Sequence, residues 1–197
     1  MSEESDIWQR YYQKALLKKH HQRCEFALKL NLSASRVAID CGCGTGADIA
    51  FLAESGYDVH GFDINEQAIT ICRERFSSTS NISLSQTSFE QFTYPSAGIV
   101  IANDSLFFAD KKQFWRTWQN IELCLEQGGV FAGDFLGNRD SWAKMGRSDI
   151  NPLSEPQVEA LFDQFEIIRR QERDEKGVTM LGREKHWHTF SIVARKK

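Results

Sequence analysis

The 197-residue chain lacks the features that mark several large classes of protein. No apolar run approaches the roughly 20 residues needed to span a bilayer. The opening, MSEESDIWQR, is acidic and polar where a signal peptide would need a basic start and an apolar run. The five cysteines are odd in number and lack the spacing of a disulfide framework. These absences predict no membrane association and a reducing, cytoplasmic compartment.

An excess of basic residues is also missing. The chain has 24 Lys and Arg against 27 Asp and Glu, a formal net charge of -3. Binding to a nucleic-acid backbone rests on clustered Lys and Arg, so nucleic acid is not an expected partner. The densest basic run, KKHHQR (residues 18–23), is short, and we interpret it as a solvated helix face.

The composition that remains, with 41% hydrophobic and 26% charged residues, fits one folded domain over residues 1–197. Residues 1–34 form an N-terminal helical segment, and strand-like and helix-like stretches alternate over residues 35–197. Such alternation predicts an α/β protein with parallel strands and helices on both faces of the sheet. The first five strand-like stretches are RVAIDCG, YDVHGFDI, NISLSQTSF, AGIVIAND and GVFAGDFLG.

The last two strand-like stretches, FEIIRRQERDE and HWHTFSIVARK, have no helix between them and turn near Gly177. They predict an antiparallel hairpin at one edge. The expected fold is therefore a Rossmann-like three-layer sandwich with a seven-stranded, mostly parallel sheet. Within it, KKQFWRTWQNIELCLEQ (residues 111–127) predicts a helix that Gly128 and Gly129 end. Its apolar face comprises Phe114, Trp118, Ile121 and Leu125.

A glycine-rich loop follows the first strand, where open α/β sheets bind their ligands. Gly42, Gly44 and Gly46 let the backbone turn sharply and approach a ligand. Gly42, Gly44 and Ala47, with Asp63 downstream, also satisfy the relaxed dinucleotide fingerprint. A nicotinamide or flavin enzyme is therefore a competing interpretation.

Asp40, at the entrance of this loop, favours a different ligand. A dinucleotide brings its pyrophosphate to the loop and the helix N-terminus, where a carboxylate would repel it. S-adenosylmethionine has no phosphate and carries a sulfonium and an ammonium cation. The chain also has only five strands before the hairpin, too few for two mononucleotide-binding halves.

VAIDCGCGTG followed by GYDVHGFDI resembles the first two motifs of class I S-adenosylmethionine-dependent methyltransferases. The segments IWQRYYQK and FSIVARKK are similar to the tellurite-resistance (TehB-like) group of that family. The resemblance implies that Asp63 binds the ribose hydroxyls and that Ile64 packs on the adenine. The family often has an acidic residue at the adenine amino group, where this chain has Ser88 followed by Phe89. The implied cofactor-binding residues are Asp40, Gly42, Gly44, Gly46, Asp63, Ile64, Ser88, Phe89 and Asn103.

The acceptor pocket is expected in the loops NDSLFFAD (residues 103–110) and GDFLGNRDSWAKMGR (residues 133–147). Arg139 and Arg147 could receive an anionic substrate or stand in an ordinary solvated loop. A helical stripe of Trp8, Tyr11 and Tyr12 could form a lid or simply pack in the core. The candidate acceptor-pocket residues are Tyr12, Phe107, Arg139 and Trp142.

HWH places His186 and His188 on one face of a strand. Either could act as general base, but no catalytic residue is assigned, and no metal is expected because no carboxylate or cysteine partner is evident. The Asn/Asp-Pro-Pro-Tyr type motif of base methylases is absent after the fourth strand. The sequence thus predicts a methyltransferase that uses S-adenosylmethionine on a small molecule and releases S-adenosylhomocysteine, as monomer or homodimer. The alternatives are an NAD(P)-dependent oxidoreductase with a single Rossmann-like domain and a catalytically silent S-adenosylmethionine-binding protein.

Overall fold

The computed structural model describes residues 3–197 and contains one seven-stranded sheet in the order β3-β2-β1-β4-β5-β7-β6. Five strands are parallel, and β7 runs antiparallel to both β5 and β6. This confirms the expected α/β class with a terminal hairpin. The strands are β1 (Val37–Cys41), β2 (Asp58–Asp63), β3 (Ile82–Gln86), β4 (Ala97–Ala102), β5 (Leu125–Leu136), β6 (Phe165–Val178) and β7 (Glu184–Lys196).

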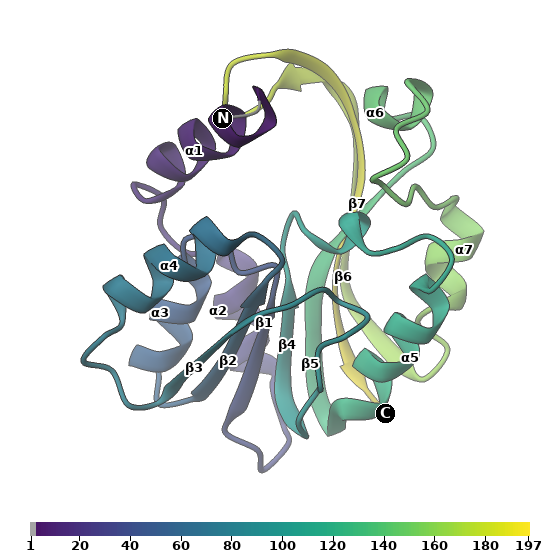
Figure 1. The fold of residues 1–197 in the computed structure, drawn as a ribbon. Coiled ribbons are helices and arrows are strands. Elements are labelled where there is room, and N and C mark those ends of the chain that lie inside the picture. Colours follow the sequence, from purple (N-terminus) through teal and green to yellow (C-terminus); the bar gives the residue numbers. More distant parts are fainter. Residues whose placement is uncertain (1–2) are drawn as a thin grey trace.

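Helices cover both faces of the sheet (Figure 1). One face packs against α2, α3 and α4, and the other packs against α5 and α7. The short helix α6 and the 3-10 helix η1 follow strands at the carboxyl edge. The helices are α1 (Glu3–Ala15), α2 (Gln22–Leu30), α3 (Ala47–Glu54), α4 (Glu66–Arg75), η1 (Leu106–Phe108), α5 (Phe114–Cys124), α6 (Ser141–Lys144) and α7 (Glu155–Ala160).

The central strand β4 shows why the apolar runs form this sheet. All six residues of AGIVIA are buried. Ile99 and Ile101 pack in the cluster under α2 and α3, whereas Val100 packs in the cluster under α5. Side chains alternate between the two faces of a strand, so a strand covered on both sides must be apolar throughout.

The α5–β5 boundary differs from the prediction, which extended the helix to residue 127. The helix ends at Cys124, and Leu125 already pairs with Ala97 in the sheet. Lys196 Nζ donates to the carbonyl oxygen of Leu125 at 2.8 Å, which satisfies a group left free at the helix end. The expected apolar face is nevertheless buried, because Leu125 enters the same core as a strand residue.

Two other expectations on element ends need correction. The third strand ends at Gln86, so Ser88 and Phe89 lie in the loop after it. The hairpin does not turn at Gly177, which pairs with Lys185; the chain turns over residues 179–183, and Thr179 N donates to Arg183 O. The longer strands carry the hairpin tip towards α1 (Figure 1), where Lys14 Nζ donates to Met180 O at 3.2 Å.

The interpretation of KKHHQR as a solvated helix face is wrong. These residues link α1 to α2, and α2 begins at Gln22. α2 packs against the sheet, with Cys24 and Ala27 fully buried beside β4 and β5. No helix in residues 3–197 has the length and apolar character needed to cross a membrane.

We predict that Trp118→Ala lowers the free energy of unfolding by about 3–5 kcal/mol, the usual cost of removing a buried tryptophan. Trp118 packs against Phe131, Phe135 and Phe162, and its Nε1 donates to Leu161 O at 2.9 Å. Urea unfolding followed by circular dichroism measures the change. Trp115→Ala, three residues earlier and 51% exposed, is the control and should cost less than about 1 kcal/mol. Equal losses in the two variants would contradict the assigned core.

Candidate functional site

The loop between β1 and α3 needs its glycines for two separate reasons. Gly42, Gly44 and Gly46 all have positive φ, at 72°, 52° and 78°, a conformation that other residues adopt only with strain. A Cβ on Gly42 would lie 2.6 Å from Ser105 Cβ, and one on Gly46 would lie 2.6 Å from the Phe76 ring. Gly42 and Gly46 therefore pack against neighbours where a side chain would not fit, and positive φ requires glycine at all three positions.

Asp63, the last residue of β2, holds this loop in place. Its Oδ2 accepts a hydrogen bond from Gly44 N at 3.0 Å, and its Oδ1 accepts one from Asn65 N at 2.9 Å. Burial raises the pKa of the carboxyl, and the backbone hydrogen bonds oppose that rise. A carboxylate has about four acceptor positions, so Asp63 keeps capacity for a ligand.

The neighbouring residues leave one apolar surface uncovered beside Asp63. Ile64 is 72% exposed, although it is a large aliphatic side chain. Phe89 is buried, and its ring lies 3.7 Å from the position of a Cβ on Gly42. Tyr94 Oη donates to Phe89 O at 3.0 Å and so positions that segment. The structure thus gathers the glycine loop, Asp63, Ile64 and Phe89, whereas a side-chain contact from Ser88 to a ligand stays a prediction.

Asn103, which follows β4, is the centre of a buried polar network. Its Nδ2 donates to Asp48 Oδ2 at 2.8 Å, and its Oδ1 accepts from Arg23 Nε at 2.8 Å. Arg23 also forms an ion pair with Asp134 of β5. The network therefore connects the start of α2 to the ends of β4 and β5.

His21 joins the same network from the residue before α2. Its backbone N donates to Asp48 Oδ1 at 2.7 Å, and its Nδ1 lies 3.1 Å from Asp48 Oδ2. Its Nε2 lies 3.5 Å from Asp104 Oδ2. Burial acts to lower the pKa of His21, but hydrogen bonds to Asp104 and Asp48 outweigh it and raise the pKa to about 10. His21 is therefore an imidazolium at neutral pH.

The sequence analysis missed His21, Arg23, Asp48, Asp104 and Asp134. His21 and Arg23 lie 27 to 168 positions from their partners, and no local pattern indicates such contacts. One signal was present: Asp48 is a charged residue in the otherwise apolar start of the helix ADIAFLAE.

The electrostatic role assigned to Asp40 also needs correction. Burial and the nearby Asp48 raise the pKa of Asp40 well above its ordinary value, which favours the neutral acid. In contrast, the protonated His21 lowers the pKa of Asp48 and of Asp104. The negative charge at the strand ends is therefore carried by Asp48 and Asp104 more than by Asp40.

α1 lies over these strand ends (Figure 1). Tyr12 is buried, and burial together with the nearby Asp63 raises its pKa. Burial, Asp104 and Asp63 raise the pKa of Tyr11 to about 12. Trp8 contacts the Phe108 ring of η1, with ring centroids 6.2 Å apart. The helical stripe therefore packs over the acidic strand ends and against the loop after β4.

Of the expected acceptor-pocket residues, Phe107 and Trp142 lie together, whereas Arg139 contacts the hairpin instead. The rings of Phe107 and Trp142 have centroids 6.4 Å apart. Lys185 Nζ lies 3.5 Å from the Trp142 ring centroid and forms a buried ion pair with Asp140. Arg139 instead forms ion pairs with Glu172 and Asp174 on the hairpin, so its charge is already balanced.

The expectation that His186 and His188 have no carboxylate partner is wrong. His186 Nε2 lies 2.6 Å from Asp174 Oδ1, and His188 Nε2 lies 3.0 Å from Glu172 Oε1. Glu172, Asp174 and His188 offer atoms within 4.8 Å of one another, close enough to hold a metal ion.

The hydrogen bonds of His188 oppose metal binding at this cluster. Its Nδ1 accepts from Arg139 N at 3.0 Å, so Nε2 carries the ring proton and donates to Glu172. A metal at Nε2 would need the lone pair that this tautomer lacks. The cluster is a satisfied ion-pair network, and the roles of His186 and His188 as general base stay predictions.

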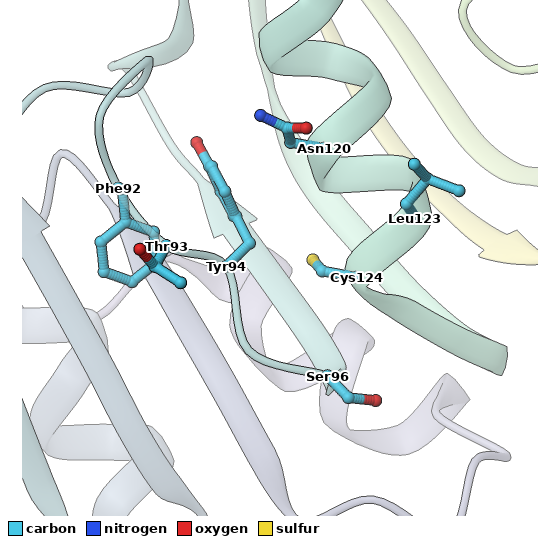
Figure 2. Close-up of a pocket in the computed structure, with 7 residues that line it drawn as sticks. All are labelled: Phe92, Thr93, Tyr94, Ser96, Asn120, Leu123 and Cys124. Atoms are coloured by element: carbon cyan, nitrogen blue, oxygen red, sulfur yellow. The ribbon is translucent and has the colours of Figure 1, made fainter.

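A cavity of about 410 Å³ lies between the loop after β3 and α5 (Figure 2). Figure 2 shows the side chains of Tyr94, Asn120 and Cys124 around it. Its lining includes neither a residue of the glycine loop nor a strand-end carboxylate. The cavity is therefore separate from the candidate site.

The glycine loop, Asp63 at the end of β2 and the strand order define a Rossmann-like fold. In comparison with known families, residues 38–129 match the model of the methyltransferase domain. The chain is 28% identical over 100 residues to a protein of Bacillus subtilis named as a methyltransferase, YqeM. That match covers 49% of this chain and 40% of the relative, so the chain spans less than half of that relative's length.

Solved structures share the fold. TehB from Haemophilus influenzae has a TM-score of 0.74 and 17% identity, covering 90% of this chain and 63% of that one. The N-methyltransferase NodS from Bradyrhizobium japonicum, in complex with S-adenosylhomocysteine, has a TM-score of 0.65 and 20% identity, with 89% and 86% covered. The 1,6-didemethyltoxoflavin N1-methyltransferase of Burkholderia thailandensis has a TM-score of 0.64 and 16% identity, with 90% and 77% covered. These structures share the fold, and together with the match over residues 38–129 they confirm the resemblance to methyltransferases.

We predict that His21→Gln destabilises the protein by about 1–2 kcal/mol near pH 7, because it removes one partner of charged hydrogen bonds that solvent partly screens. The pKa of His21 is about 10 in the fold, above its ordinary 6.5. The stabilisation is therefore complete below about pH 6.5 and is lost as the pH rises through about 10.

Urea unfolding of both proteins at several pH values measures this difference. It should shrink as the pH rises from 7 to 10.5, provided that the wild-type protein is still folded there. His60→Gln, on β2, is the control and should show no such alkaline loss. A difference that stays constant or grows with pH would refute the charged His21.

Proposed function

We propose that the protein is an S-adenosylmethionine-dependent methyltransferase that acts on a small molecule and releases S-adenosylhomocysteine. The observation that carries this proposal is the glycine loop held by Asp63, with the exposed Ile64 beside it. The match of residues 38–129 to the methyltransferase domain supports it.

The residues present fit the cofactor at each of its parts. Asp63 has acceptor capacity for the ribose diol, and Ile64 offers an uncovered apolar face for adenine. The loop of Gly42, Gly44 and Gly46, all with positive φ, adjoins Asp63 through the Gly44 hydrogen bond. Asp48 and Asp104, kept ionised by His21, provide negative charge for the cationic methionine end, near Asn103.

When bound, S-adenosylmethionine supplies a methyl group already activated by a positive sulfur. The chain then has to align the acceptor with that group and exclude water. α1, with Trp8, Tyr11 and Tyr12, is placed to cover the site, and we propose that residues 1–34 include this lid. α2 also lies within residues 1–34, but it packs on the sheet and shares a hydrophobic core with residues 35–197.

We place the acceptor between the lid and the loops after β4 and β5, where Phe107, Phe108 and Trp142 form an aromatic group. A small molecule suits a site enclosed by a helix and two short loops. The methyltransferase of Burkholderia thailandensis was solved with 1,6-didemethyltoxoflavin, a small molecule, and supports this choice. We propose a cytoplasmic location, consistent with five free cysteines, and a monomer or homodimer.

We predict that Asp63→Ala weakens the binding of S-adenosylhomocysteine by about 100-fold, and Asp63→Asn by about 10-fold. Each lost hydrogen bond to a charged group is worth about 1.5–3 kcal/mol, and 1.4 kcal/mol is a factor of 10. The amide keeps one acceptor and the size of the side chain. Isothermal titration calorimetry measures each Kd.

Asp58→Ala is the matched control, because Asp58 is an exposed acid at the other end of β2. Its affinity should equal that of the wild type. Circular dichroism checks that the Asp63 variants remain folded, since Asp63 also holds Gly44 and Asn65. Unchanged affinity in a folded Asp63→Ala variant would refute the assigned ribose contact.

A further inference from the structure

A second cleft, outside the cofactor site described above, lies between the start of α2 and the outer strands β6 and β7. Its volume is about 120 Å³. Basic and neutral polar side chains dominate its lining, and no carboxylate is among the described residues that form it. The polar lining residues are His21, Gln22, Arg23, Arg169, Gln171 and Ser191.

The charge balance of this cleft leaves one cation uncompensated. His21 is neutralised by Asp48 and Asp104, and Arg23 by Asp134. Arg169 has no carboxylate within ion-pair distance among residues 7–197, whose side chains the structure describes. Its guanidinium instead lies over the Phe26 ring, 4.2 Å from the centroid, which fixes its position at the wall of the cleft.

Neighbouring arginines on the hairpin differ from Arg169 in this respect. Arg170 pairs with Glu155 and Glu159, Arg173 with Glu175, and Arg195 with Glu166. An arginine held in a cleft without a counter-ion presents the fork of donors that recognises carboxylates and phosphates.

The strand register places further polar groups around Arg169. Gln171 lies two residues along β6 on the same face and pairs with Ser191 of β7. Gln22 and Arg23 face them from the first turn of α2. The guanidinium and the two glutamine amides thus supply donors around a volume that fits one small anionic group, whereas the Ser191 hydroxyl already donates to Asp134.

The cleft adjoins the polar network of the proposed methyl-transfer site. Arg23 lines the cleft and also donates to Asn103 Oδ1 at 2.8 Å. Ser191, which also lines it, donates to Asp134. Arg23 and Ser191 thus link the cleft to the residues around Asn103.

We propose that this cleft binds the anionic group of the methyl acceptor, a carboxylate or a phosphoester, with Arg169 as its main partner. This inference rests on the proposed methyltransferase function. It makes Arg169 a specificity residue that touches the acceptor away from the reacting atom.

Binding of two simple probes tests the cleft directly. Acetate stands for a carboxylate and inorganic phosphate for a phosphoester, and each is titrated into the protein saturated with S-adenosylhomocysteine. The measurement is the change in the backbone amide NMR signals of Gln22, Gln171 and Ser191. We expect saturable shifts with a millimolar Kd for at least one probe, and the tighter probe identifies the anionic group.

The paired variants are Arg169→Gln and Arg170→Gln, neighbours on β6 that point to opposite faces. Arg169→Gln should weaken probe binding at least 10-fold, and Arg170→Gln should leave it within twofold of the wild type. Absence of saturable shifts with both probes, or equal binding in Arg169→Gln, would overturn the proposal.

Titration of S-adenosylhomocysteine into the same three proteins separates this inference from the proposed function. We expect equal cofactor affinity in all three. If the cofactor binds and neither probe does, the cleft proposal fails alone. If the probes bind but the cofactor does not, the methyltransferase proposal fails, and the assignment of the anion to an acceptor fails with it.

Discussion

The hydrogen bond from Gly44 to Asp63 is the contact on which the rest of the site depends. It joins the loop after β1 to the end of β2 at 3.0 Å. Three glycines with positive φ give that loop its shape, and a loop of this kind needs an external partner to stay in one conformation. Asp63 provides the partner and keeps acceptor positions free, so the carboxylate that shapes the loop is also the one proposed to bind the ribose.

A second set of contacts connects the N-terminal segment to the same strand ends. His21 and Arg23 reach Asp48, Asn103 and Asp104, which follow β1 and β4, and Asp134 near the end of β5. Without these two cations, several carboxylates would repel one another beneath α1. The network therefore fixes the start of α2, from which the chain leads back through residues 16–20 to α1. The placement of α1, the proposed lid, and the charge at the strand ends thus depend on the same residues.

The sequence predicted the order of strands because hydrophobic periodicity is local and each strand carries its own pattern. Asp63 was also found from the sequence, since it ends a strand at a set distance from a glycine loop. His21 and Arg23 could not be found in this way, because their partners lie far along the chain and KKHHQR resembles a solvated surface. The charge of Asp40 was misjudged for a related reason: its burial and its proximity to Asp48 arise only in the folded chain.

Arg139 shows that a residue chosen from the sequence as a ligand contact can already be paired in the fold. As a basic residue in a long loop after β5 it was a reasonable acceptor contact, yet the hairpin places Glu172 and Asp174 against it. Arg169 drew no attention in the sequence, yet among the arginines of β6 and β7 it is the one without a carboxylate within ion-pair distance in residues 7–197. Which arginine is available for a ligand is decided by the register of β6 and β7, which periodicity alone does not give.

Calorimetric titration of the wild-type protein with S-adenosylhomocysteine, beside the same titration with NAD, tests the central claim most directly. The two ligands share an adenosine that Asp63 and Ile64 could hold, but only NAD brings a pyrophosphate to the acidic strand ends. The account predicts binding of S-adenosylhomocysteine in the micromolar range and no heat from NAD. Binding of NAD without S-adenosylhomocysteine would contradict it.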